Sequence, residues 1–212
     1  MNNNIKAAVI GSTGKSGKYL LPILLQNGFA CRILLREPLK LAHLSNAVEI
    51  VQGDARNYGD VNNLLKGCNV VISTLGQPTG EPPIFSAAAK NVILAMQQHN
   101  ITRYIATTGL SVNAPGDKKG PAATFGTEWM YKNYPATTAD KQAELNELLQ
   151  SGIDWTLIRL PLIEQTDDAP KTFVSLQDCP GSNISATSLA HFIIEQVGNT
   201  TYSRNAPFIA NK

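Results

Sequence analysis

The chain forms its first predicted strand with Ile5-Lys6-Ala7-Ala8-Val9-Ile10 and leaves it through Gly11-Ser12-Thr13-Gly14-Lys15-Ser16-Gly17, and this stretch decides the fold. An apolar run that ends in three glycines, each three residues apart, and continues into residues 18–25 predicts a strand, a glycine turn and a helix. Gly11 allows the sharp exit from the strand, Gly14 lets a pyrophosphate approach the backbone, and Gly17 lets the helix lie close to the strand. The free N–H groups of the first helical turn then face the anion, so the turn predicts a nucleotide site.

The end of the second predicted strand, residues 30–35, indicates which nucleotide binds. Where a site for NAD has an Asp or Glu that binds the ribose 2′-hydroxyl, this chain has Arg36, and a guanidinium suits a 2′-phosphate. Lys15 and the hydroxyls of Ser12 and Thr13 can complete a positively charged pocket around the same group. The pattern therefore favours NADP(H) over NAD(H). The alternative is that Arg36 and Lys15 are solvated surface charges.

Length and composition favour one domain over residues 1–212 and make several partners improbable. The 212 residues, 43% of them hydrophobic, suffice for one α/β domain and are short for two. A formal net charge of +2 gives no basic footprint for nucleic acid. No apolar stretch is long enough to span a membrane, and residues 1–4 lead into a strand without a secretory signal, so we expect a cytoplasmic protein with no membrane partner.

The cysteines and histidines predict no metal site and no disulfide framework. Both sets are widely spaced, and no C-x-x-C pair occurs. We expect the cysteines to be buried thiols and the histidines to be packing or surface residues. The residues are Cys31, Cys68, Cys179, His43, His99 and His191.

Strands and helices alternate along the chain, which predicts an α/β Rossmann fold. Such spacing is typical of a doubly wound parallel sheet, in the order 3-2-1-4-5-6, with helices on both faces and the ligand across the carboxyl ends of the strands. The predicted strands are 5–10, 30–35, 48–51, 70–75, 103–107 and 155–160, and the predicted helices after the first are 61–65, 84–99 and 138–150. A strand over 172–176, a helix over 186–197 and a short run around 207–209 follow.

Residues 111–136 depart from this rhythm. The segment is rich in Gly, Pro, Ala and Asn, yet it carries Phe125, Trp129, Met130, Tyr131 and Tyr134. A long loop with large apolar groups after a strand is often a lid or a substrate wall. A small satellite core is the alternative.

Several motifs beyond the glycine turn carry a family resemblance. They are Leu34-Leu35-Arg36, Gly53-Asp54, Thr74-Leu75-Gly76, Thr107-Thr108-Gly109, residues 139–144 and residues 152–159. With them, nearly the whole chain resembles the atypical short-chain dehydrogenase/reductases, specifically the small NAD(P)-binding, NmrA-like branch that includes NADPH-dependent flavin or quinone reductases. The resemblance implies that Asp54 and Ala55 meet the adenine. It also implies that Leu75 and Gly76 lie along the adenosine ribose, with Thr74 as a further cofactor-binding residue, and that the residues near Thr107 and Thr108 face the nicotinamide.

The resemblance also implies a lysine that hydrogen-bonds the nicotinamide ribose, and here that residue is Lys141. A helical wheel supports it, because Lys141 shares a face with Leu145 and Leu148, whereas Asp140, Glu144 and Glu147 gather on the other side. A lysine at the centre of an apolar face has to reach a partner. The alternative is a lysine whose stem lies on the core and whose amine reaches solvent.

The chain departs from the family at two positions. Reductases of the larger family have a tyrosine proton donor four residues before that lysine. Here the position holds Thr137, and residues 137–140 look like a helix N-terminal capping sequence. The tyrosine mechanism is therefore expected to be absent, unless Tyr131 or Tyr134 swings in. At the end of the sixth strand, Leu160 separates Arg159 from Pro161, where relatives have proline directly after arginine, and this leaves the nicotinamide floor undecided between Leu160 and Pro161.

These expectations combine into one interpretation. The protein is an NADP(H)-binding reductase with Lys141 and Thr108 as catalytic candidates, and it passes hydride to a quinone, a flavin or a conjugated small molecule that needs little acid catalysis. The alternative is a redox sensor that binds NADP(H) without turnover. Either protein is expected to be a monomer or a homodimer.

Overall fold

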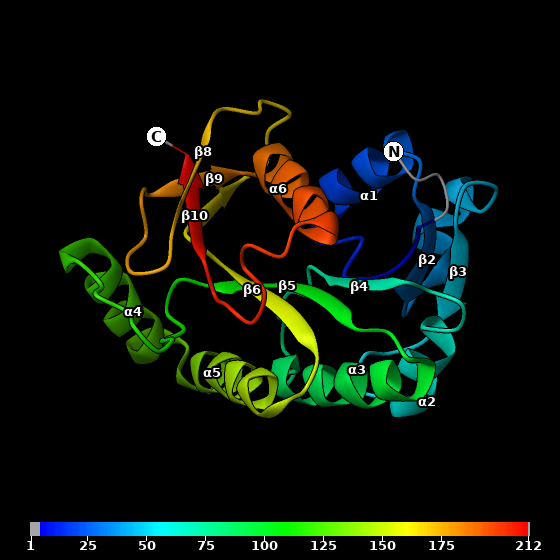
Figure 1. Ribbon diagram of the computed structural model, residues 1–212, viewed down its shortest axis with the longest axis horizontal. Helices are drawn as coiled ribbons and strands as arrows, with labels where there is room; N and C mark the ends of the chain where they lie inside the picture. Colours follow the sequence, from blue (N-terminus) through cyan, green and yellow to red (C-terminus); the bar gives the residue numbers. More distant parts are fainter. Residues whose placement is uncertain (1–4, 212) are drawn as a thin grey trace.

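The computed structural model describes residues 5–211, apart from the side chains of residues 42 and 43, and its centre is a ten-stranded sheet (Figure 1). The strand order is β3-β2-β1-β4-β5-β6-β10-β9-β7, with β8 paired to β10, so the predicted order 3-2-1-4-5-6 is confirmed and continues at one edge. The strands are β1 Lys6–Ile10, β2 Ala30–Leu35, β3 Glu49–Gln52, β4 Val70–Ser73, β5 Arg103–Gly109, β6 Asp154–Leu160, β7 Leu162–Glu164, β8 Thr172–Ser175, β9 Asn183–Ser185 and β10 Phe208–Asn211.

Helices cover both faces of the sheet. In Figure 1, α1 and α6 lie on one face, and α2, α3 and α5 lie on the other. The helices are α1 Gly17–Gln26, α2 Tyr58–Leu64, α3 Phe85–His99, α4 Pro121–Asn133, α5 Pro135–Gln150 and α6 Ala186–Gly198, with a 3-10 segment, η1, over Pro38–Leu44. Among the helices that the structure describes, none is long and apolar enough to cross a membrane.

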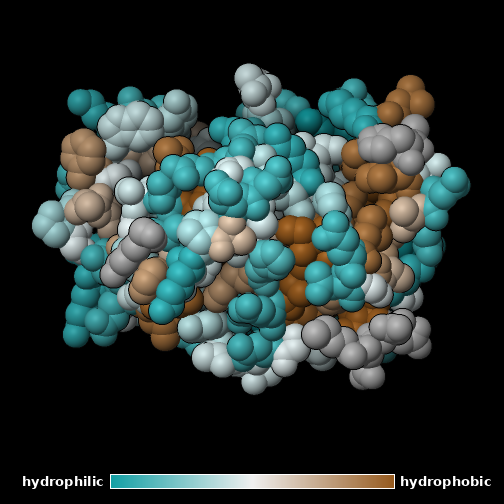
Figure 2. All heavy atoms as spheres, turned by 90° about the horizontal axis from the view of Figure 1, so that it is seen from above, coloured by the Kyte–Doolittle hydropathy of each residue, from teal (hydrophilic) through white to brown (hydrophobic). Residues whose placement is uncertain are grey.

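Alternate residues of β1 supply two separate cores. Ala7 and Val9 pack in the cluster beneath α1 and α6, whereas Ala8 and Ile10 pack in the cluster beneath α3 and α5. Because a strand points successive side chains to opposite faces, an all-apolar strand is the expected sequence for a sheet that is covered on both sides. Figure 2 shows the outer surface on the α1 and α6 side, where hydrophilic residues predominate and most hydrophobic ones gather towards α1.

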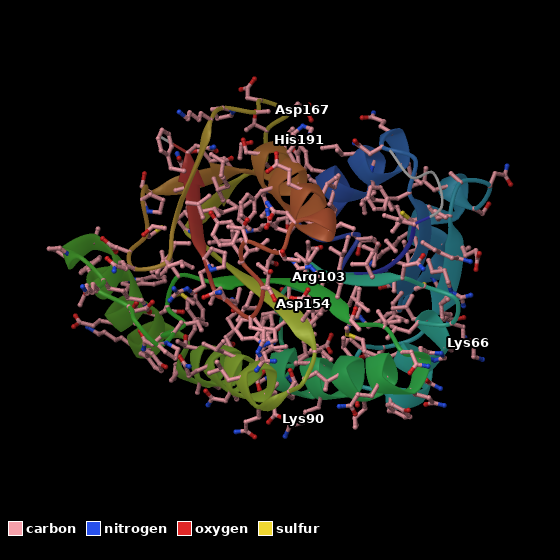
Figure 3. The ribbon with its side chains drawn as sticks, viewed as in Figure 1. Lys66, Lys90, Arg103, Asp154, Asp167 and His191 are labelled. Atoms are coloured by element: carbon pink, nitrogen blue, oxygen red, sulfur yellow. The ribbon has the colours of Figure 1, made fainter. Side chains whose placement is uncertain are left out.

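The two ends of the parallel strands have different roles. At the amino ends, the buried Arg103 of β5 forms an ion pair of 3.1 Å with the half-buried Asp154 of β6, and Figure 3 shows the two side by side. The Arg103 guanidinium also donates to the carbonyl of Gln196 and to the hydroxyl of Thr156. These contacts tie β5, β6 and α6 together at the amino ends, whereas folds of this kind bind ligands at the carboxyl ends.

Residues 111–136, expected as a loop or lid, contain the helix α4. Pro121 stands in its first turn, where a missing N–H costs nothing. Phe125, Trp129 and Tyr134 remain exposed, and Ala123 is the buried residue of this helix. The satellite core is therefore not formed by these aromatic side chains.

Arg159 of β6 holds the start of that segment against the sheet. Its guanidinium, which is 0% exposed, donates to the carbonyl of Val112 and forms a 2.6 Å ion pair with Asp117. It also stacks on the ring of Phe208, 3.5 Å from the centroid. A composition rich in glycine and proline cannot reveal such an anchor, because the anchor comes from a distant strand.

Candidate functional site

The glycine turn packs as tightly as its spacing predicts. Gly11 has a φ of +83°, and a Cβ there would lie 2.6 Å from the carbonyl oxygen of Thr74. A Cβ on Gly17 would lie 2.0 Å from the Gly11 carbonyl oxygen, which no side chain tolerates. At Gly14 the nearest such atom is 3.3 Å away, and this glycine lines a cavity. The turn therefore offers bare backbone to a ligand at Gly14, which fits a pyrophosphate.

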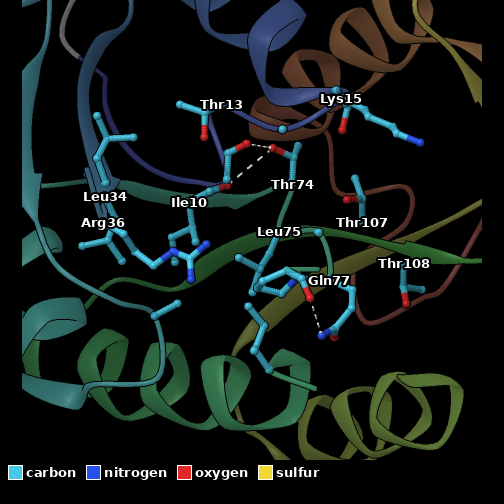
Figure 4. A pocket seen from close by; sticks show the side chains of 18 of the residues that line it. Ile10, Thr13, Lys15, Leu34, Arg36, Thr74, Leu75, Gln77, Thr107 and Thr108 are labelled. Carbon is cyan, nitrogen blue, oxygen red and sulfur yellow. Dashed lines mark hydrogen bonds between the residues drawn. The ribbon is translucent and has the colours of Figure 1, made fainter. Parts of the chain in front are cut away.

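The cavity, of about 590 Å³, extends along the carboxyl ends of β1, β2, β4, β5 and β6 (Figure 4). Most of the candidate site residues line it. They are Gly11, Thr13, Gly14, Lys15, Ser16, Arg36, Asp54, Ala55, Thr74, Leu75, Gly76, Thr107, Thr108, Lys141, Leu160 and Pro161. Ser12 and Gly17 do not line it: Ser12 is buried beneath the turn, and Gly17 meets the Gly11 backbone.

At one end of the cavity, here called the arginine end, two guanidinium groups form ion pairs with the same carboxylate. Arg36 forms an ion pair with Glu81, and Arg56 forms another with it at 2.8 Å. Arg56 also donates through two nitrogens to Asp54, at 3.0 and 2.6 Å. The Arg36 guanidinium lowers the pKa of the Glu81 carboxyl, so Glu81 is a carboxylate at neutral pH. Sequence reasoning missed Arg56 and Glu81, although Arg56 follows the Gly53-Asp54 motif directly.

Lys15 does not share the arginine end, contrary to the expectation. Figure 4 shows Lys15 on the side of Thr107, across the cavity from Arg36. The two residues come from different loops, and their separation along the sheet edge could not be read from the sequence. The nearest acid after β2, Glu37, forms an ion pair with Lys40 at 2.8 Å.

One amide side chain holds together the loop between β4 and α3. The Gln77 side chain donates to the carbonyls of Pro78, Glu81 and Pro82, at 3.1, 2.8 and 3.2 Å, and Figure 4 draws one such bond. These bonds hold the loop that carries Glu81.

The other end of the cavity, here called the lysine end, is formed by Thr107, Thr108, Lys141, Leu160 and Pro161. The Lys141 ammonium lies 4.9 Å from the centroid of the buried Phe85 ring, and burial lowers its pKa. Lys141 lines the cavity and is half-buried. Leu160 and Pro161 are both buried and both line this end.

The helical wheel of α5 was wrong about its acidic residues. Glu144 is only 4% exposed and shares the inner side with Lys141, and burial raises the pKa of its carboxyl to about 8. Asp140 accepts from the backbone N–H groups of Phe85 and Ser86, and so caps α3. Glu147 pairs with Lys90 of α3 at 3.3 Å. Asp140 and Glu147 therefore face α3, which packs against α5, whereas Glu144 is buried on the inner side.

Thr137 is not the cap of its helix. α5 begins at Pro135, with Tyr134 as its N-cap, so Thr137 lies inside the first turn. It is half-buried and does not line the cavity. Tyr131 and Tyr134 are exposed at the end of α4 and do not line it either. In the described chain, no tyrosine, histidine or cysteine lines the cavity.

Residues 5–211 contain no group of three or more His, Cys, Asp or Glu side chains placed to hold a metal ion. Cys31 and Cys68 are buried and Cys179 is half-buried. The cavity offers two kinds of group to a ligand, with bare backbone and arginines at one side and Thr108 with Lys141 at the other.

Comparisons with known proteins agree with this geometry. The model of a family described as NAD(P)H-binding matches residues 11–200. Cinnamoyl-CoA reductase 1 of Petunia hybrida is 24% identical over an alignment of 178 residues that covers 74% of this chain and 54% of that protein. The chain thus spans about half the length of this curated relative.

Two solved structures share the fold. Anaerobillin reductase ChuY of Escherichia coli O157:H7 is similar with a TM-score of 0.80 and 20% identity, covering 97% of each chain. A short-chain dehydrogenase/reductase of Veillonella parvula, solved in complex with NADP, is similar with a TM-score of 0.78 and 16% identity, covering 98% of this chain and 94% of that one. At these identities the likeness concerns the fold.

Proposed function

This chain belongs to the NAD(P)H-binding family, and we propose that it acts there as one NADP(H)-binding domain that reduces a small molecule. The hydride goes from NADPH to a quinone, a flavin or another conjugated acceptor, without a tyrosine acid. The observation that carries this proposal is the single cavity that joins the glycine turn to Lys141 and Thr108. When bound, the nicotinamide supplies the hydride, and the protein supplies position and charge.

The arginine end supports a preference for NADP(H). Arg36 and Arg56 together present two guanidinium groups, which suit the two or more oxygens of a 2′-phosphate. Glu37, the acid that follows β2, is already paired with Lys40. Asp54 and Ala55 would then lie near the adenine, and Thr74, Leu75 and Gly76 along its ribose.

The lysine end supports a role in positioning. Lys141 would hold the nicotinamide ribose, and Thr107, Thr108, Leu160 and Pro161 would form the walls around the ring. For a conjugated acceptor, holding the reacting atoms about 3–3.5 Å apart supplies much of the rate. We therefore assign positioning to Lys141, with the substrate contact at Thr108.

An NADP(H)-binding redox sensor of the NmrA-like type is the second candidate. The observation that favours it is the outer side of α4, where Phe125, Trp129 and Tyr134 are 70, 47 and 54% exposed outside the cavity. Exposed aromatic residues in one patch are typical of protein contacts. We keep a cytoplasmic monomer or homodimer as the working expectation for both functions.

The proposal is tested by calorimetric titration with NADPH and NADH, followed by NADPH oxidation with a panel of quinones and flavins. We expect tighter binding of NADPH and oxidation with at least one acceptor. Lys141→Ala should weaken cofactor binding or turnover, whereas Lys90→Ala, on the outside of α3, serves as the control. Binding without oxidation of NADPH by any acceptor would favour the sensor.

A further inference from the structure

Three buried side-chain oxygens without an aligned hydrogen bond lie at the lysine end. They are Thr108 Oγ1, Ser111 Oγ and Glu144 Oε2, on residues that are 5, 1 and 4% exposed. Within the described chain none of the three atoms has a partner of good geometry. Folded proteins satisfy nearly all buried polar groups, so such a cluster needs an explanation.

Of these residues Thr108 lines the cavity, and Ser111 and Glu144 lie behind the wall. A Cβ placed on Gly109 would lie 3.6 Å from both Lys141 Nζ and Ser111 Oγ, so these two atoms face the same glycine. The Thr108 hydroxyl lies beside the Glu144 carboxyl. Thr108 and Lys141 line the cavity, and Glu144 lies one helical turn behind Lys141 without lining it. A carboxyl group is thus separated from the cavity by one hydroxyl.

The surroundings of Glu144 keep a proton on its carboxyl. Burial is the largest cause and the Asp140 carboxylate adds to it, while the Lys141 ammonium and the Thr108 hydroxyl act against it, and together they raise the pKa of Glu144 to about 8. On the sheet side, Tyr104 of β5 is buried, and burial together with Glu144 raises the pKa of its phenol, so Tyr104 also stays protonated. At neutral pH Glu144 is therefore a neutral acid, which can donate.

We propose that Glu144 stores the proton that the reduced acceptor takes up, and that the Thr108 hydroxyl delivers it at the cavity wall. This rests on the proposed reductase function. The acceptor is reduced by the hydride from NADPH, which is oxidised to NADP+, and its oxygen becomes an anion. Thr108 gives its hydroxyl proton to that oxygen and takes the carboxyl proton of Glu144. One O–H bond thus breaks and one forms at Thr108, and Glu144 is left as a carboxylate facing the Lys141 ammonium until solvent returns the proton.

In this proposal Thr108 is the catalytic residue, and Glu144 acts through it. The relay also explains how the site works with Thr137 where relatives have tyrosine. The proton comes from Glu144, one helical turn after Lys141, and passes through Thr108 of the sheet. In relatives the tyrosine donor lies one turn before the lysine.

Infrared spectroscopy tests the stored proton without turnover. We expect a carboxylic acid band that is present at about pH 6, lost as the pH passes about 8, and missing in Glu144→Gln. Thermal unfolding gives a second readout. An acid whose pKa is raised by folding destabilises the native state above its unfolded pKa, so Glu144→Gln should gain stability relative to wild type between about pH 4.5 and 8. A Glu144 that is ionised at pH 6 would overturn the proposal.

Menadione reduction by NADPH tests the relay. We expect the wild-type kcat to fall above about pH 8, and Glu144→Gln to lower kcat by about tenfold or more and remove that pH step. Thr108→Val should also lower kcat and remove the pH step, whereas Thr108→Ser, which keeps a hydroxyl, should retain turnover. Glu147→Gln is the control, because Glu147 lies on the same helix but pairs with Lys90.

The outcomes separate the two proposals. If Glu144→Gln and Thr108→Val reduce menadione with the wild-type kcat, the relay is overturned and the reductase function stands. A wild type that binds NADPH but reduces neither menadione nor FMN overturns the reductase function, and the relay with it.

Discussion

Arg36, directly after β2, forms an ion pair with Glu81 of the loop before α3, and the pair lies at the arginine end of the cavity. Arg56 shares the same carboxylate at 2.8 Å. Glu81 thus occupies the two guanidinium groups that a 2′-phosphate would need. For NADP(H) to bind here, its 2′-phosphate has to replace the Glu81 carboxylate as the partner of Arg36 and Arg56.

Glu81→Gln should therefore tighten NADPH binding. The neutral amide competes less for Arg36 and Arg56, and we expect a gain of about two- to fivefold, the scale of an exposed ion pair. NADH, which has no 2′-phosphate, should bind as before. Calorimetric titration of both cofactors measures the effect, and Glu147→Gln is the matched control because its partner Lys90 lies outside the cavity. An equal gain in affinity for NADH and NADPH would contradict the idea that the 2′-phosphate replaces the Glu81 carboxylate.

Arg36→Ala should weaken NADPH binding by about 1.5–3 kcal/mol, the range of hydrogen bonds to a charged group. Arg56→Ala should also weaken NADPH binding, since Arg56 pairs with the same carboxylate, that of Glu81. Arg32→Ala is the control, because Arg32 lies on the same strand but pairs with Glu49 away from the cavity. Similar dissociation constants for NADPH and NADH in the native protein would rule out the preference.

The glycine turn permits a paired test. Gly14→Val should leave the protein folded, because a Cβ there meets no atom closer than 3.3 Å, but it should abolish NADPH binding by filling the phosphate space. Gly17→Ala should instead disturb the fold, since its Cβ would lie 2.0 Å from the Gly11 carbonyl oxygen. Circular dichroism and cofactor titration distinguish the two. Native affinity in folded Gly14→Val would contradict the assignment of the pyrophosphate site.

Asp140→Ala should destabilise the protein by about 1–2 kcal/mol, the usual effect of a lost helix cap, because the N–H groups of Phe85 and Ser86 lose their acceptor. Thr137→Ala should change the free energy of unfolding by less than about 0.5 kcal/mol, since its side chain caps nothing. Urea denaturation measures both. A larger loss at Thr137 than at Asp140 would show that the capping sequence read from residues 137–140 was right after all.

Local patterns predicted the sheet order because β1 to β6 are short apolar runs separated by helices. The same patterns misjudged α5, because a helical wheel assumes that charged residues face solvent. Asp140 and Glu147 instead face α3, and Glu144 faces the sheet. Residues 111–136, expected to form a loop or lid, contain α4, and the buried Arg159 of β6 holds the start of the segment through Val112 and Asp117.

The sequence by itself determined the doubly wound fold, the tight turn at Gly11 and Gly17, and the place of Arg36 after β2, because these depend on neighbouring residues and on backbone sterics. Only the tertiary structure decided that Arg56 and Glu81 share the arginine end, that Lys15 lies apart from it, and that Glu144 is buried behind Thr108. These three features join segments far apart in the chain. Their contacts and their burial arise only when the sheet edge brings the loops together, and burial is what changes the charge of a carboxyl group.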